Sequence, residues 1–142
     1  MRRKRVNWMN KKTITQIIGA ILLLYWVTLL ILTSTPAPEL PKVDISDKVV
    51  HFGAYFVLAI FFQLYVFLKK GESVFNGKIK TWALTIIVLM LYGGVDEVHQ
   101  AFIPGRLADL LDFIADTLGV VTAVILLTPL LKQEVIAKFF RR

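Results

Sequence analysis

Ionisable and polar side chains gather in three short stretches of a chain that is otherwise strongly apolar. Clustered carboxylates near a histidine are suitable ligands for a divalent cation such as Mg²⁺, Mn²⁺ or Zn²⁺. Arginine and lysine suit a phosphate group, because arginine offers a two-pronged hydrogen-bond fork and lysine a compact charge. The candidate ligand-binding residues are Asp47, Lys48, His51, Asp96, Glu97, Gln100, Arg106, Asp109, Asp112 and Asp116.

These residues recur at helical spacing. Side chains three, four or seven positions apart lie on one face of a helix. This spacing relates Asp47 to His51, Asp96 to His99 and Gln100, and Asp109 to Asp112 and Asp116. Three helices would therefore each carry one polar stripe.

The helices themselves are predicted from hydropathy. Of the 142 residues, 56% are hydrophobic and 19% charged, which is too apolar for a typical soluble domain. Four apolar segments, at about residues 13–33, 48–68, 79–100 and 110–131, each approach the roughly 20 residues that a helix needs to cross a bilayer. We therefore expect an all-α integral membrane four-helix bundle, formed as a single domain over residues 1–142 with basic tails at both ends.

The last two segments cannot cross a bilayer without part of their acidic stripes. Fifteen uncharged residues separate Lys80 from Asp96, and fifteen separate Asp116 from Lys132, whereas a comfortable span takes about 17–25. Because a charge facing lipid is costly, we expect the stripes to converge on a polar pocket. In this pocket we expect Asp47, Lys48 and His51 to face Asp96, Glu97 and Gln100, with Arg106 above and Asp112 and Asp116 on a third wall.

Orientation is predicted from the basic residues. Fourteen of the seventeen lysines and arginines lie in segments that would share one side of the membrane, so the positive-inside rule places both termini in the cytoplasm and the polar pocket on the outer side. The net charge of +7 is thereby explained, and we expect no nucleic-acid partner. The apolar run after the basic N-terminus is longer than a signal-peptide core, so we expect a retained first helix.

Two loops would join the helices on the outer side. The stretch from Thr35 to Pro41 contains three prolines and should end the first helix. Pro104 and Gly105 are typical of the central positions of a tight turn, which would hold Arg106 over the mouth of the pocket.

Three motifs give the chain a resemblance to a known family. The strings DKxxHFxxY from Asp47, DExHQxFxPGR from Asp96 and DxxxDxxG from Asp112 occur in this order and at helix ends. In combination they resemble the VanZ-like family of bacterial membrane proteins, over about residues 14–131. The resemblance implies a small multi-pass protein of the bacterial plasma membrane and cell envelope, and the founding member is associated with lowered susceptibility to teicoplanin.

The first functional hypothesis is a binding protein. The pocket would hold a membrane lipid, a lipid-linked sugar or a phosphate head group, with Arg106 and Lys48 on the phosphate. The candidate residues include six carboxylates against these two cations, so an anion would need protons or a divalent cation to offset the negative charge.

Two other hypotheses stay open. A metal-dependent membrane enzyme acting on a phosphate ester or pyrophosphate could use the carboxylates as ligands, and the candidates are Asp96, Glu97, Asp112 and Asp116. Alternatively, the polar residues could pair with one another and hold the helices together, with no small-molecule site. Proton-coupled transport is a variant of the first hypothesis, and a homodimer would give such a pathway more helices.

Overall fold

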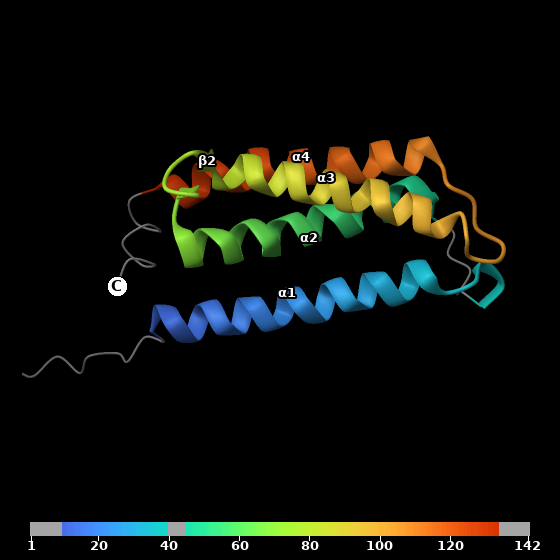
Figure 1. The fold of residues 1–142 in the computed structure, drawn as a ribbon, viewed down its shortest axis with the longest axis horizontal. Helices are drawn as coiled ribbons and strands as arrows, with labels where there is room; N and C mark the ends of the chain where they lie inside the picture. The colour runs from blue at the N-terminus through green and yellow to red at the C-terminus, as the bar shows by residue number, and fades with distance from the viewer. Residues whose placement is uncertain (1–9, 40–44, 134–142) are drawn as a thin grey trace, which may run out of the picture.

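The computed structural model of the chain describes residues 10–39 and 45–133, and within these ranges it is a bundle of four long helices (Figure 1). The elements are α1 (Lys11–Ser34), η1 (Ala37–Glu39), α2 (Asp47–Lys70), β1 (Ser73–Val74), β2 (Ile79–Lys80), α3 (Thr81–Gln100) and α4 (Leu110–Lys132). Each long helix has the length and hydropathy to cross a membrane. The predicted all-α fold is confirmed, whereas the basic tails at residues 1–9 and 134–142 lie outside the described ranges.

A two-stranded hairpin joins α2 to α3, and it shortens the third predicted helix. Ser73 pairs with Lys80 and Val74 with Ile79 in antiparallel register. Phe75, Asn76 and Gly77 all have positive φ between the strands, a conformation that Asn and Gly adopt most readily. Because Ile79 and Lys80 pair with β1, α3 begins at Thr81 instead of residue 79.

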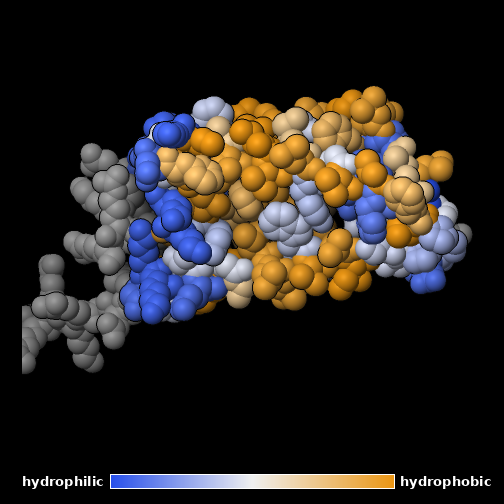
Figure 2. All heavy atoms as spheres, viewed as in Figure 1, coloured by the Kyte–Doolittle hydropathy of each residue, from blue (hydrophilic) through white to orange (hydrophobic). Residues whose placement is uncertain are grey.

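Polar residues gather at the two ends of the bundle, and an apolar band lies between them (Figure 2). We call one end the acidic end; it carries residues 45–51 and 96–116, where α1 and α3 finish and α2 and α4 begin. The opposite, basic end carries Lys11, Lys12, Lys69, Lys70, Lys78, Lys80 and Lys132. This division agrees with the pattern expected of helices that cross a bilayer.

The most extensive helix contact is between α2 and α4. Gly119 permits it, because a Cβ atom there would collide with the backbone carbonyl oxygen of Phe52 and lie 3.0 Å from the Phe56 nitrogen. Small residues allow helix backbones to approach closely in membranes, where van der Waals packing drives association. About two helical turns from Gly119, toward the acidic end, the same close approach brings the polar stripes of α2 and α4 together.

Helix α1 packs along α2 through aromatic side chains. Tyr25 lies 6.1 Å from Phe61, and Trp26 lies 5.9 Å from Phe62 and 5.0 Å from Tyr92, measured between ring centroids. The sequence alone favours lipid-facing rings at Phe61 and Phe62 and an interfacial position for Tyr92. In the structure these three rings are partly buried against the core and join α1 to α2 and α3.

We predict that Gly119→Ala destabilises the bundle. A methyl group would force α2 and α4 apart, and overpacking of this kind typically costs about 1–3 kcal/mol. Gly53→Ala is the matched control, because a Cβ at Gly53 meets nothing within 4 Å and alanine favours a helix. Thermal unfolding in detergent should show a lower midpoint for Gly119→Ala and an unchanged or higher midpoint for Gly53→Ala. Equal midpoints in both variants would contradict the packing role of Gly119.

Candidate functional site

Arg106 is positioned by a tight turn between α3 and α4. The Arg106 amide donates to the carbonyl of Ile103 at 3.1 Å, and Gly105 between them has φ +77°. These are the features of a type II turn with Pro104 and Gly105 at its central positions, as predicted. The turn also contacts η1, because the Ala37 amide donates to the Pro104 carbonyl at 3.2 Å.

The guanidinium of Arg106 ties the end of α1 to the end of α3. Its Nε donates to the carbonyl of Thr35 at 3.0 Å and its Nη2 to that of Leu32 at 2.7 Å. Its Nη1 donates to Gln100 Oε1 at 2.9 Å. Arginine has five N–H donors. Three of them contact described residues, so two are left for another acceptor.

Lys48 joins α2 to α4 by ion pairs. Its Nζ lies 2.5 Å from Asp109 Oδ2 and 2.7 Å from Asp112 Oδ1. Asp109 is also the N-cap of α4, since its side chain accepts a hydrogen bond from the Leu111 amide at 2.8 Å. The Lys48 ammonium has the largest effect on the pKa of the Asp109 carboxyl and lowers it from its ordinary value. The Leu111 amide lowers this pKa further.

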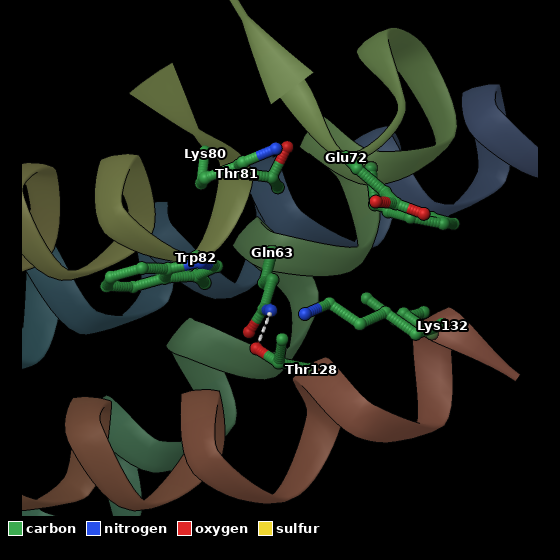
Figure 3. Close-up of a pocket in the computed structure, with 9 residues that line it drawn as sticks. Gln63, Glu72, Lys80, Thr81, Trp82, Thr128 and Lys132 are labelled. Atoms are coloured by element: carbon green, nitrogen blue, oxygen red, sulfur yellow. Dashed lines mark hydrogen bonds between the residues drawn. The ribbon is translucent and has the colours of Figure 1, made fainter. Parts of the chain in front are cut away.

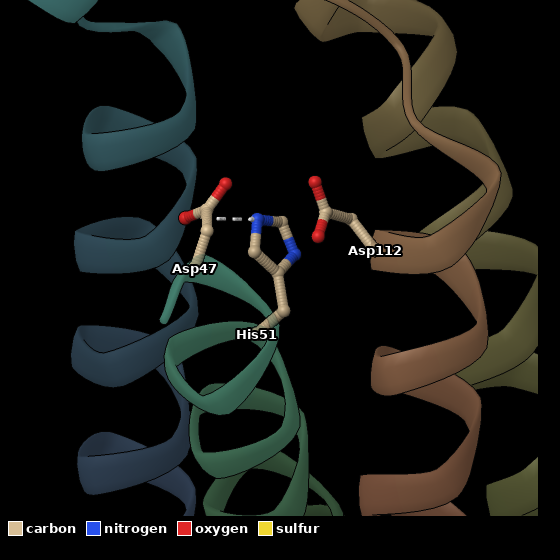
Figure 4. A group of neighbouring side chains, drawn as sticks. All are labelled: Asp47, His51 and Asp112. Carbon is tan, nitrogen blue, oxygen red and sulfur yellow. Dashed lines mark ion pairs between the residues drawn. The ribbon is translucent and has the colours of Figure 1, made fainter. Parts of the chain in front are cut away.

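His51 lies at the centre of the acidic end, surrounded by carboxylates. Its Nδ1 lies 3.0 Å from Asp116 Oδ1 and 3.9 Å from Glu97 Oε1, while its Nε2 lies 4.0 Å from Asp47 Oδ1. Figure 4 shows Asp47 and Asp112 on opposite sides of the imidazole ring. His51, Glu97 and Asp116 are buried, whereas the Asp47 side chain is 70% exposed.

Asp96 and Glu97 come from adjacent positions of α3 and have different partners. Asp96 Oδ2 accepts long hydrogen bonds from the Tyr55 hydroxyl at 3.4 Å and from Gln100 Nε2 at 3.3 Å. Glu97 Oε2 accepts from the backbone amide of Asp109 at 2.9 Å. Both carboxylates are buried, so the last turn of α3 brings two acidic groups inside the bundle.

A cavity of about 410 Å³ opens beside this cluster, between α1, α2 and α3. Part of its wall is apolar and part is polar and ionisable. The lining residues are Leu29, Leu32, Thr33, Ile45, Asp47, Val50, His51, Ala54, Tyr55, Asp96 and Arg106. Such a wall is complementary to an amphiphile, that is, a molecule with one apolar and one polar part.

The structure brings the predicted residues to one end of the bundle, in an arrangement that differs in part from the one expected. His51 faces Glu97 of α3 as expected, but it also lies against Asp116 of α4. Lys48 pairs with α4 instead of facing α3. The cavity wall includes four of the ten predicted residues, namely Asp47, His51, Asp96 and Arg106. The others lie behind the wall or beside it, in the contacts between α2, α3 and α4.

Two parts of the site were absent from the sequence-based prediction. Tyr55 contacts Asp96 and lines the cavity; its position four residues after His51, within the first family motif, could have indicated it. The apolar wall from Leu29 and Leu32 of α1 carries no distinguishing sequence signal. His99, which was expected on the same stripe as Asp96, makes no side-chain hydrogen bond to the described residues.

Two further hollows lie at the basic end. One of about 70 Å³ is lined by residues that include Gln63 and Lys132, and Gln63 donates to the Thr128 hydroxyl at 2.8 Å (Figure 3). The other is an open groove of about 780 Å³ between α1 and α2, near Gly19 and Lys69. Neither brings a buried carboxylate and a histidine together, so the acidic end is the better candidate for a functional site.

Comparison with known proteins agrees with the motifs. The family model described as VanZ/LLP1 matches residues 2–132. An uncharacterised protein of the fission yeast Schizosaccharomyces pombe is 36% identical over 91 residues, which cover 63% of this chain and 51% of the yeast protein. The chain therefore matches about half the length of that relative. No solved structure shows significant similarity to the chain.

We predict that Lys48→Met raises the pKa of Asp109. A carboxyl whose folded-state pKa is depressed stabilises the fold above its unfolded-state pKa of about 3.9, and this contribution is lost as the pH falls through the lower folded-state value. The Asp109 carboxyl ¹³C resonance of protein in lipid nanodiscs should titrate at higher pH in Lys48→Met than in the wild type. Lys69→Met, at the basic end, should leave that titration unchanged. An unaltered Asp109 titration in Lys48→Met would contradict the ion pair.

Proposed function

The chain belongs to the VanZ/LLP1 family, and we propose that this multi-pass membrane protein binds the polar head group of a membrane lipid or lipid-linked molecule in the cavity at its acidic end. The observation that carries the proposal is the mixed lining of that cavity. Leu29, Leu32 and Val50 supply an apolar wall, and His51, Asp96 and Arg106 supply a polar one. An amphiphile could place its chain on the first wall and its head group on the second.

The polar wall indicates the chemistry of the head group. Two N–H donors of Arg106 are not used in contacts with the described residues, and they suit a phosphate oxygen. Asp47 and Asp96 are hydrogen-bond acceptors, which suit the hydroxyl groups of a sugar or an ammonium group. A phosphate that carries a sugar or an amine would satisfy both, whereas a simple anion would be repelled by the surrounding carboxylates.

We extend the proposal to the location of the protein. The excess of lysine and arginine at the basic end supports a topology with both termini in the cytoplasm and the acidic end at the outer side of the membrane. The family resemblance is the ground for proposing a bacterial plasma membrane. The head group would then be bound in the outer leaflet, where lipid-linked precursors of the cell envelope are used.

The family resemblance supports one physiological consequence. If the bound molecule is a lipid-linked envelope precursor, sequestering or moving it would alter the response of the cell to a glycopeptide. We therefore expect that expression of this chain in a susceptible host lowers susceptibility to teicoplanin. An unchanged minimum inhibitory concentration, with the protein present in the membrane, would contradict this consequence while leaving lipid binding to be judged by its own experiment.

We predict that filling the cavity removes the bound lipid. Val50 lines the cavity, so Val50→Trp should place an indole ring where the lipid chain would lie. Native mass spectrometry of gently solubilised protein should detect a phosphate-containing lipid on the wild type and at least about tenfold less on Val50→Trp, a loss that corresponds to roughly 1.4 kcal/mol.

The neighbouring residue supplies the control. Val49 is 59% exposed, similar to Val50 at 47%, but is not part of the cavity wall. Val49→Trp adds the same ring to the same helix and should retain the lipid. Equal lipid retention by the two variants, or a wild type that carries no lipid above the detergent background, would contradict the proposed function.

A further inference from the structure

Three side chains from three helices converge on one point behind the cavity wall. They are His51 of α2, Glu97 of α3 and Asp116 of α4, and one ligand atom from each lies within 4.8 Å of the other two. His51 Nδ1 is 3.0 Å from Asp116 Oδ1 and 3.9 Å from Glu97 Oε1. Nitrogen and oxygen ligands lie about 2.0–2.2 Å from Zn²⁺, which places adjacent ligands about 3–3.6 Å apart. His51 Nδ1 and Asp116 Oδ1 already have this separation, and Glu97 would have to move closer to complete the geometry.

Carboxylate oxygens in this cluster are buried without hydrogen-bond partners. Glu97 is 6% exposed and Asp116 1% exposed. Neither Glu97 Oε1 nor Asp116 Oδ2 has a hydrogen-bond partner among the described residues. Leaving a buried acceptor unsatisfied costs free energy. Glu97 Oε1 is the Glu97 atom that lies 3.9 Å from His51 Nδ1, so this unsatisfied oxygen faces the imidazole at the centre of the cluster.

The charges of the described residues at the acidic end also leave this cluster without a full countercharge. Lys48 is paired with Asp109 and Asp112, and Arg106 donates to backbone carbonyls and to Gln100. Neither cation contacts Glu97 or Asp116. Two buried carboxylates beside one imidazole require a positive charge or protons, because uncompensated charges are very costly inside a membrane protein.

We propose that His51 Nδ1, Glu97 and Asp116 form a binding site for one divalent first-row metal ion, Zn²⁺ or Mn²⁺. Imidazole favours zinc, and carboxylates also accept manganese. Three protein ligands leave at least one coordination position for water or another group. This site does not require the lipid proposed above, although it shares His51 with the cavity wall, and a cation there would add positive charge next to a bound phosphate.

A second group of potential ligands shares His51 but is less suitable. It comprises Asp47, His51 and Asp112. Asp47 is exposed and its oxygen lies 4.0 Å from His51 Nε2, while Lys48 lies 2.7 Å from Asp112 and would repel a cation. We assign Asp47 a supporting role, since a carboxylate near the second ring nitrogen, through one water, orients a metal-bound histidine. Asp96, a metal candidate on sequence grounds, belongs to neither group.

The test uses the 142-residue chain in detergent with its purification tag removed, so that no added histidines bind metal. The chain is stripped with a chelator and then titrated with Zn²⁺ or Mn²⁺ while its thermal unfolding is followed. An ion that binds the folded state raises the unfolding midpoint, and at about 100 times the dissociation constant the shift is several degrees. Metal analysis after desalting should give about one ion per chain.

Asp116→Asn and Asp112→Asn form the critical pair of variants. Both replace a buried aspartate of α4 by its isostere, one helical turn apart, but Asp116 alone of the two belongs to the proposed site. Asp116→Asn, and likewise Glu97→Gln, should lose the metal-dependent shift, whereas Asp112→Asn should keep it. Glu97→Gln retains an oxygen that can accept the Asp109 amide, so we expect it to fold.

Two results would overturn the proposal. If the wild type shows no shift with either metal, and Glu97→Gln raises the midpoint of the metal-free protein, the carboxyls are neutralised by protons. If Asp112→Asn abolishes the shift and Asp116→Asn retains it, the ion binds the other group. Titration of the wild type with Co²⁺ gives a check that needs no variant. A buried three-ligand site should produce visible absorption that a chelator removes. If no such absorption appears, the result counts against the site.

Discussion

The structure depends on how four buried carboxylates are compensated inside helices that cross a membrane. Four buried carboxylates, Asp96, Glu97, Asp112 and Asp116, are each 6% exposed or less, and the apolar lengths of α3 and α4 force them into the bundle. Because lipid cannot solvate them, every stripe must find its partners on another helix. Lys48 compensates Asp112, amide and hydroxyl donors contact Asp96, and His51 lies between Glu97 and Asp116.

Close backbone approach makes this compensation geometrically feasible. Gly119 lets α4 contact the backbone of α2, and Gly93 leaves room on α3 beside Asp116 and Tyr55. Helix α1 is not needed for the charge contacts, and it is held by aromatic packing and by Arg106. That difference explains why the cavity opens between α1 and the acidic cluster, with one apolar wall and one polar wall.

Much of this architecture could be predicted from the sequence, since hydropathy marks the membrane helices and helical spacing marks their polar faces. The type II turn before Arg106 also followed from Pro104 and Gly105. Pairing across helices could not be predicted, because spacing gives the face of a residue but not its partner: Lys48 was expected to face α3 and instead contacts Asp109 and Asp112 of α4. The aromatic contacts of α1 were missed for a similar reason, since a phenylalanine in an apolar helix suits lipid and protein equally well.

We propose that the acidic end is a ligand site and not merely a set of contacts between helices. An experimental structure of the protein in a native-lipid nanodisc tests this most directly. We expect an elongated density in the cavity, with its polar end at Arg106 and Asp96 and its apolar end along Leu29. A cavity closed by α1 packed against His51, with no density between them, would contradict it.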